Sequence, residues 1–137
     1  MRIVVAVGLP GSGKSTYFEK LNTISSDAIR EQLTGDAGNQ SVNHQIFAKM
    51  RALLDRERDV AYIDATNLTR RERRQWFKPG CEMEAVYFDV PLGICKARNA
   101  ARSRVVSEHV LDLMAAKLVP PSIEEGFSKV EVVRHLP

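Results

Sequence analysis

A glycine-rich segment near the N-terminus has the residue types of a phosphate-binding loop. Residues 8–15 read Gly-Leu-Pro-Gly-Ser-Gly-Lys-Ser and match GxxxxGK[ST], the Walker A or P-loop pattern. Glycines let main-chain N–H groups approach phosphate oxygens without a Cβ atom between them. The pattern favours a bound nucleoside triphosphate over a turn without a ligand. The expected nucleotide contacts are Gly8, Pro10, Gly11, Ser12, Gly13, Lys14, Ser15 and Thr16.

Two residues of this loop have a specific chemical task in the prediction. Lys14 adds a positive charge for the β and γ phosphates, so we count it among the catalytic residues. The hydroxyl of Ser15 can bind Mg²⁺. The expected cofactors are therefore ATP, or another nucleoside triphosphate, and Mg²⁺.

Asp27 and Arg30 are the next residues whose types suit phosphoryl transfer. They follow a short predicted strand and lie three positions apart, so a helix would present both on one face. A carboxylate at the carboxyl end of a parallel strand could accept the proton of an acceptor hydroxyl. The neighbouring arginine could hold the acceptor or the reacting phosphate. The structural alternative is that Asp27 is a helix N-cap and pairs with Arg30.

A third cluster follows the apolar residues 60–63. Asp64 ends this stretch as the acidic residue of a Walker B strand does, and it would hold Mg²⁺ while orienting Ser15. Thr66 and Asn67 come next and could reach the acceptor or the phosphates. Ser15 and Asp64 are the predicted metal ligands. The alternative is that Asp64 is a turn residue at the end of the strand.

Three arginines in the second half of the chain form a candidate cationic clamp. Arg98 and Arg102 are four positions apart and would share a helix face, where like charges repel slightly. Arg104 follows directly after that helix. Arginines on a mobile lid can neutralise the charge that develops on a transferred phosphoryl group. We expect all three to contact the nucleotide, with a solvated basic face as the alternative.

Strands and helices must alternate along the chain to bring these clusters together. Short β-branched or aromatic runs predict strands, and apolar residues at helical spacing predict helices. The alternation favours an α/β three-layer sandwich with a mainly parallel sheet of about five strands and a helical lid. The expected strands cover residues 3–7, 24–26, 60–63, 85–88 and 130–133. The expected helices cover residues 14–21, 27–33, 42–56, 69–77, 92–101 and 108–118, with a loop at 34–41.

Length and composition indicate a single globular domain over residues 1–137. Hydrophobic residues make up 44% of the chain and charged residues 27%, so disorder is not expected. No apolar run approaches the roughly 20 residues of a membrane helix, and no signal peptide is apparent. The histidines are scattered away from Cys81 and Cys95. We therefore expect reduced thiols, no zinc site and no membrane partner.

Positive charge is concentrated in the second half of the chain. Residues 70–104 hold nine Lys and Arg against four Asp and Glu, which predicts an anionic partner such as a nucleotide or a nucleic acid. Arg70 and the arginines up to Arg74 could bind backbone phosphates, with Trp76 stacked on a base. The alternative is a solvated helix face. For Trp76 we favour a structural role, in which it closes the helix onto the sheet.

A P-loop alone does not distinguish kinases from GTPases, motors or switches. The NKxD pattern, by which GTPases recognise their base, is absent from the sequence. An AAA+ motor would usually need a longer chain. The clusters around Asp27, Asp64 and Arg98 supply what a kinase needs: a base, a metal ligand and a cationic lid.

Four segments, in this order, resemble the 5′-kinase module of phage and bacterial polynucleotide kinases. They are GLPGSGKST at 8–16, SSDAIR at 25–30, DATNL at 64–68 and FDVPLGICKARNAAR at 88–102. The resemblance covers nearly the whole chain. It implies transfer of the ATP γ-phosphate to a 5′-hydroxyl end of DNA or RNA, in the cytoplasm of a bacterial or phage-infected cell.

The same resemblance assigns roles to residues. Asp27 would be the general base that activates the 5′-hydroxyl, and Arg30 would contact the acceptor end and the reacting phosphate. Asp64 and Asn67 would support metal and acceptor. Arg102 would act on the γ-phosphate, with the two nearby arginines assisting.

Two other functions stay open at this point. The chain could be a P-loop kinase of a small acceptor, such as a nucleoside, a nucleotide sugar, an antibiotic or a hydroxymethylated base. It could also be a nucleotide-binding switch or partner protein without phosphotransfer. The sequence does not indicate an oligomeric state.

Overall fold

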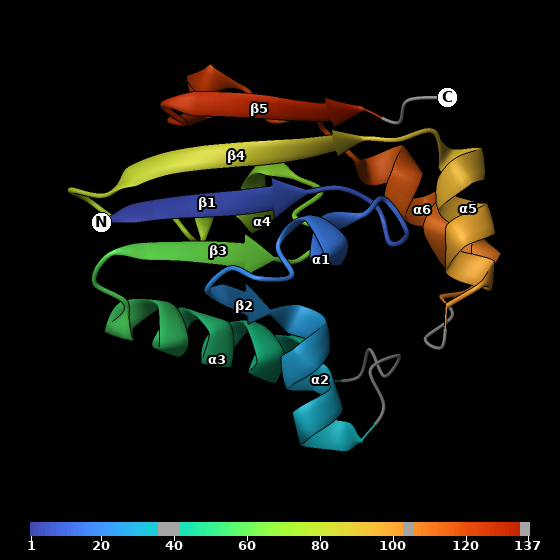
Figure 1. Cartoon of the computed structure of the whole chain (residues 1–137), viewed down its shortest axis with the longest axis horizontal. Coiled ribbons are helices and arrows are strands. Elements are labelled where there is room, and N and C mark those ends of the chain that lie inside the picture. The colour runs from blue at the N-terminus through green and yellow to red at the C-terminus, as the bar shows by residue number, and fades with distance from the viewer. Residues whose placement is uncertain (36–41, 103–105, 135–137) are drawn as a thin grey trace.

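The sheet contains five parallel strands in the order β2-β3-β1-β4-β5. A computed structural model of the chain describes residues 1–35, 42–102 and 106–134. In Figure 1 the carboxyl ends of the strands point toward α5 (Leu92–Ala100) and α6 (Glu108–Lys117). The predicted α/β class is confirmed. The strands are β1 (Arg2–Val7), β2 (Thr23–Ser25), β3 (Val60–Asp64), β4 (Glu82–Asp89) and β5 (Lys129–Arg134).

Strand β1 is buried on both faces, as its uninterrupted apolar run predicts. Ile3, Val5 and Val7 belong to the larger hydrophobic cluster on one face of the sheet. Val4 and Ala6 belong to a smaller cluster on the other face. The loop that follows β1 therefore starts from the centre of the core, which fixes its position.

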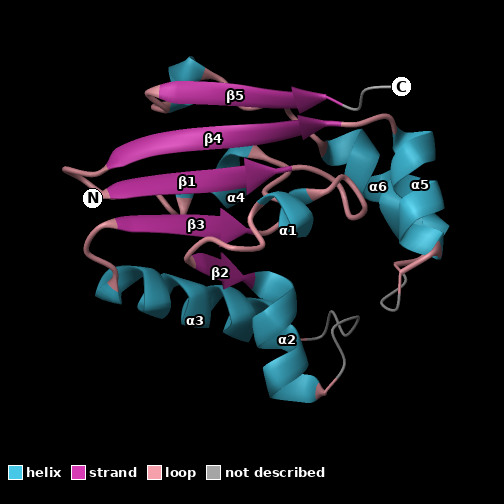
Figure 2. Cartoon of the chain, viewed as in Figure 1, coloured by secondary structure: helices cyan, strands magenta, loops and turns pink. Residues whose placement is uncertain are grey.

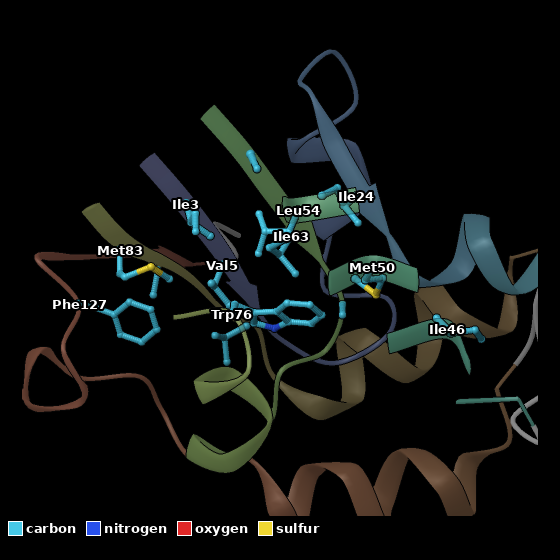
Figure 3. Packing of buried hydrophobic residues seen from close by; sticks show 14 of the residues in the cluster. Ile3, Val5, Ile24, Ile46, Met50, Leu54, Ile63, Trp76, Met83 and Phe127 are labelled. Carbon is cyan, nitrogen blue, oxygen red and sulfur yellow. The ribbon is translucent and has the colours of Figure 1, made fainter. Parts of the chain in front are cut away.

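The larger cluster lies under α3 (Asn43–Arg56) and the segment that follows α4 (Arg70–Arg74). Apolar residues at helical spacing on α3, such as Ile46 and Met50, are fully buried. Trp76 is also fully buried, and Figure 3 shows its indole ring beneath Val5 among the core side chains. The structural role that we favoured for Trp76 is confirmed.

Helix α1 (Lys14–Tyr17) is shorter than the predicted helix over 14–21. Phe18 turns onto the opposite face of the sheet from α3 and is 1% exposed. The carbonyl of Phe18 accepts hydrogen bonds from the N–H of Leu21 and the hydroxyl of Thr23. These bonds belong to a turn, so the helix does not continue past this point. The prediction was wrong because burial of Phe18 outweighs helix continuation.

Helix α2 (Ser26–Thr34) begins one residue earlier than expected, and Asp27 is not its N-cap. The cap is Ser25, whose hydroxyl accepts a 3.2 Å hydrogen bond from the N–H of Ala28. The Asp27 carboxylate is therefore not used as a cap. Gly35, with φ 72, ends the helix in the left-handed conformation typical of a C-terminal glycine.

The expected basic face of α4 is exposed at Arg70, Arg71 and Arg74 but not at Arg73. Arg73 is fully buried and forms a two-pronged pair with Glu125, with Nε to Oε1 at 2.8 Å and Nη2 to Oε2 at 2.9 Å. Its third nitrogen, Nη1, donates to the carbonyl oxygens of Asn67 and Val119. The pair fastens the C-terminal segment, including η1 (Ile123–Glu125), to the end of β3.

The remaining expected helices are present with shifted ends, as Figure 2 shows in cyan. Pro91 directly precedes α5, as its N-cap residue. Within the described parts of the chain, no helix has the length and apolar character needed to cross a membrane.

Candidate active site

A cavity of about 920 Å³ lies at the carboxyl ends of the strands. Its walls come from the P-loop, α2, α3, the segment after β3, α5, α6 and the end of β5. The chain runs from β1 to β2 at one edge of the sheet and from β4 to β5 at the other edge. The P-loop, which follows β1, therefore begins at a topological switch point between β1 and β4. Ligands of open parallel sheets bind at such points.

The geometry of the P-loop requires glycine at its centre. Gly11 has φ 83, and a Cβ atom there would lie 2.5 Å from the carbonyl oxygen of Cys95 in α5. Gly13 has φ 100 and forms the N-cap of α1. Gly8 donates a 3.0 Å hydrogen bond from its N–H to the carbonyl of Thr66, which ties the loop to the end of β3.

Lys14 is 8% exposed and folds back onto its own loop. Its Nζ atom donates hydrogen bonds to the carbonyl oxygens of Gly8 at 3.0 Å and Leu9 at 2.9 Å. Burial lowers the pKa of Lys14, and the negative charges of Asp64 and Asp27 oppose this shift only in part. A phosphate group beside Nζ would supply the missing counter-charge.

Ser15 and Asp64, the two predicted metal ligands, contact each other. The Ser15 hydroxyl donates a 2.9 Å hydrogen bond to Oδ2 of Asp64, which is 7% exposed. The Asp64 carbonyl accepts a weaker bond of 3.4 Å from Ser26 Oγ. A hydroxyl and a carboxylate are hard oxygen ligands of the kind Mg²⁺ prefers, so the donor set fits this ion.

A buried polar atom in the P-loop also fits a missing ligand. Ser12 lines the cavity and is 4% exposed. Its hydroxyl oxygen has no hydrogen-bond partner among the described residues. Such unsatisfied groups are uncommon in native proteins and are explained where a bound phosphate or water completes them.

Asp27 lies in the same cavity between two arginines. Its Oδ1 atom accepts a 2.9 Å bond from Nη1 of Arg30, and its Oδ2 atom lies 3.8 Å from Nη2 of Arg102. The Arg30 side chain is 6% exposed, whereas that of Asp27 is 37% exposed and open to the cavity. Nη2 of Arg30 donates to Oδ1 of Asn43 at 2.8 Å, which fixes the guanidinium.

Two of the predicted clamp residues lie on α5 or just after it. Nη1 of Arg98 lies 3.4 Å from the Gly11 carbonyl, above the P-loop. Arg102 follows the end of α5 and lines the cavity. Arg104 lies outside the described residues, so its predicted contact stays a prediction. Asn99, which the sequence analysis missed, hydrogen-bonds through its amide nitrogen and oxygen to the main chain of Val106, shortly before α6.

Among the predicted site residues that the structure describes, three are not in the cavity lining: Gly8, Asn67 and Arg70. Asn67 is 2% exposed; its amide nitrogen donates to the Ala6 carbonyl at 2.7 Å and its Oδ1 accepts from Nε1 of Trp76 at 2.7 Å. It adopts φ 47, which asparagine tolerates, and it joins β1 to the core. Arg70 lies apart from the cavity beside Ser122 and Glu124. The observed contacts of Asn67 are therefore with the core of the protein, and not with the cavity where the acceptor was expected to bind.

The cavity contains side chains that the sequence analysis did not single out. Those from α1, from β4 with the residue that follows it, and from β5 are Tyr17, Phe88, Val90, Val133 and Arg134. Those from α3, from the segment after β3, from α4 and from α6 are Asn43, Phe47, Leu68, Glu72, Met114 and Lys117. The four-residue spacing of Asn43 and Phe47 is a signal in the sequence, but helical spacing does not tell a cavity wall from a core face.

A family model described as an AAA domain matches residues 3–121. The chain belongs to this AAA domain family. A curated relative, transcription factor bHLH140 of Arabidopsis thaliana, is 28% identical over 148 residues, a match that covers 93% of this chain. The chain spans only 15% of the length of that relative.

Two solved structures share the fold of this AAA domain. A gluconokinase from Sinorhizobium meliloti 1021 superposes with a TM-score of 0.65 at 19% identity, covering 97% of this chain and 82% of its own. A sugar kinase from Janibacter sp. HTCC2649 superposes with a TM-score of 0.65 at 20% identity, and the match covers 98% of this chain and 85% of the sugar kinase. The domain therefore shares the fold of these two kinases. The comparisons do not single out polynucleotide kinases.

Proposed function

We propose that this domain is an ATP-dependent phosphotransferase that uses Mg²⁺ and phosphorylates a hydroxyl group of a small-molecule acceptor. The observation that carries the proposal is the position of Asp27. Its carboxylate opens into the cavity that also holds Lys14 and the Ser15–Asp64 pair. A base, a phosphate-binding loop and a metal-type donor set in one cavity are the parts that phosphoryl transfer to an alcohol needs.

In the proposed reaction the acceptor oxygen forms a bond to the γ-phosphorus while the bond to the bridging oxygen of ADP breaks. Asp27 accepts the proton of the attacking hydroxyl. ATP supplies the phosphoryl group, and Mg²⁺ neutralises part of its charge. Ser15 and Asp64 would hold the metal ion.

The cations of the chain would stabilise the charge that develops on the transferred group. Lys14 would turn from the Gly8 and Leu9 carbonyls to the phosphates. Arg30 pairs with Asp27 from α2, and Arg102, just after α5, lies near the same carboxylate, so both would contact the acceptor or the γ-phosphate. Preorganised donors of this kind contribute more in an enclosed site than in water.

A small-molecule acceptor is better supported than a polynucleotide end. The two solved structures with the same fold are those of a gluconokinase and a sugar kinase. Arg70, which we expected to bind backbone phosphates, is not part of the cavity lining. The 5′-hydroxyl end of DNA or RNA stays a second candidate because of the ordered motifs and the exposed Arg71 and Arg74 on α4.

The proposal is tested by incubating the purified protein with Mg²⁺, γ-labelled ATP and separate acceptors. Labelling of a free nucleoside, sugar or sugar acid supports the small-molecule function. Labelling only of a 5′-hydroxyl oligonucleotide replaces it with the second candidate. Binding of ATP without labelling of any acceptor would overturn both in favour of a nucleotide-binding switch.

A further inference from the structure

Three apolar side chains of the cavity lining come from parts of the chain other than β4 and β5. They are Phe47 of α3, Leu68 after β3 and Met114 of α6. Leu68 is 3% exposed, and the other two are half-buried. No contact with triphosphate or metal is expected of them, because their side chains carry no charge and no hydrogen-bond donor.

This apolar surface is continuous with the site around Asp27. Arg30 bonds to Asp27 through Nη1 and to Asn43 through Nη2. Asn43 and Phe47 lie four residues apart on α3, so they occupy the same helix face. One wall of the cavity therefore runs from the reacting carboxylate to the Phe47 ring.

The three apolar side chains are held together by the core beneath them. The Phe47 ring packs against Trp76 with ring centroids 6.3 Å apart, and Trp76 donates to Asn67, the residue before Leu68. Met114 packs against the small cluster that contains Leu68. The apolar surface is thus built on three elements that are fixed relative to one another.

A charged pair borders this surface. Nζ of Lys117 lies 3.7 Å from Oε1 of Glu72, and the other carboxylate oxygen of Glu72 accepts a 3.0 Å bond from the N–H of Leu68. Lys117 follows Met114 by three residues, so both lie on one face of α6. The pair offers one hydrogen-bond donor and one acceptor at the edge of the apolar surface.

We propose that the acceptor carries a flat apolar ring with polar edge atoms beside the reacting hydroxyl, and that Phe47, Leu68 and Met114 bind this ring. The inference rests on the proposed phosphotransfer and narrows its substrate class. An open-chain polyol would place hydroxyl groups against apolar side chains that cannot hydrogen-bond to them, which is unfavourable. A ring fills the surface, and its edge meets Glu72 and Lys117.

The test compares ring-bearing alcohols with polyols as acceptors at saturating ATP and Mg²⁺. Thymidine and pyridoxine represent the first class, and gluconate and glycerol the second. We expect kcat/KM to be at least about tenfold higher for the ring-bearing class, as an apolar pocket discriminates by such factors. An oligonucleotide that begins with thymidine and has a free 5′-hydroxyl is compared with free thymidine. The comparison shows whether the ring-bearing acceptor must be a small molecule. Higher kcat/KM for gluconate or glycerol overturns the proposal.

A matched pair of variants on α6 tests whether the preference for ring-bearing acceptors depends on the apolar surface. Met114→Gln keeps the side-chain length but adds an amide, and we expect it to lower kcat/KM for the preferred ring-bearing acceptor about tenfold with an unchanged KM for ATP. Leu113→Gln changes the neighbouring side chain, which is 53% exposed and outside the cavity, and should have no effect. Equal loss in both variants, or no loss in Met114→Gln, overturns the assignment.

A binding measurement separates failure of this inference from failure of the proposed function. Equilibrium dialysis with ADP, Mg²⁺ and labelled thymidine, pyridoxine or gluconate needs no turnover. Tighter binding of a ring-bearing compound that Met114→Gln weakens supports the inference even if no acceptor is phosphorylated. Tighter binding of gluconate contradicts the inference and leaves the phosphotransfer proposal standing.

Discussion

The hydroxyl of Ser15 donates a 2.9 Å hydrogen bond to Oδ2 of Asp64. The two residues are far apart in the sequence, and the parallel pairing of β1 with β3 brings them together. This pairing places the P-loop and the carboxyl end of β3 on the same edge of the sheet. The bond therefore joins the predicted phosphate-binding residue to the predicted metal ligand.

The variant Asp64→Asn should weaken the binding of Mg²⁺ that we propose for this pair. We expect the Mg²⁺ concentration for half-maximal phosphotransfer to rise by at least about tenfold, since an amide is a poorer ligand than a carboxylate for a hard cation. A Mg²⁺ titration of the rate measures it. Asp59→Asn, at the opposite end of the same strand and exposed, is the control. An unchanged titration in Asp64→Asn contradicts the metal assignment.

The variant Asp27→Asn tests the general base. An amide cannot accept the proton, so we expect kcat to fall by between about 100-fold and 10,000-fold while ATP affinity stays nearly unchanged. Single-turnover transfer and ATP titration measure the two effects. Glu31→Gln, an exposed carboxylate of the same helix, should leave both unchanged. Retention of full activity in Asp27→Asn would remove Asp27 from the reaction.

The variant Lys14→Ala should lose both rate and some affinity for ATP, because the charge that faces the phosphates is removed. The pKa of Lys14 is lowered by burial, so the lysine loses its proton at a lower pH than an exposed lysine. ATP affinity of the unmodified protein should therefore decline at a lower alkaline pH than an exposed lysine would give, and a pH series of ATP titrations measures this. Lys20→Ala, an exposed lysine, serves as the control. Unchanged turnover in Lys14→Ala would argue against the phosphate contact.

The variant Glu125→Gln tests the buried pair with Arg73. Burial alone would raise the pKa of Glu125, but hydrogen bonds from Arg73 and the Ser122 N–H, together with the charge of Arg73, outweigh it and lower the pKa. A carboxyl group whose pKa is lowered by folding stabilises the fold fully at a pH above its pKa in the unfolded chain, which is about 4.3. This stabilisation is lost as the pH falls through the pKa of the folded protein. Loss of one partner should lower the free energy of unfolding at pH 7 by about 3–5 kcal/mol.

Denaturant unfolding at pH 7 and through the acid range measures both parts of this prediction. The unmodified protein should lose stability between about pH 4 and more acidic values, and Glu125→Gln should show a shallower slope there. Glu124→Gln, the exposed neighbour, should resemble the unmodified protein in both measurements. Equal stability of Glu125→Gln and Glu124→Gln at pH 7 would contradict a stabilising role for the pair.

Local sequence features predicted the segments whose structure depends mainly on residues close to them in the sequence. The apolar run Ile3–Val7 with the glycine-rich loop after it indicates a buried strand and a phosphate loop, because residue size and backbone freedom act locally there. The alternation of strands with helices then predicts the parallel sheet. Asp27 and Asp64 were placed at one edge of the sheet on this basis, and both line the cavity.

The sequence by itself determined the chemistry that this chain carries: the glycines, the lysine and the carboxylates at the ends of apolar strands. Only the tertiary structure decided which polar side chains face the cavity. Asn67 and Arg73 resemble site residues in the sequence, yet burial against Trp76 and Glu125 gives them structural roles. Phe47 and Met114 are ordinary apolar helix residues that become cavity walls. Such outcomes depend on contacts between distant segments, which hydrophobic spacing along one segment does not contain.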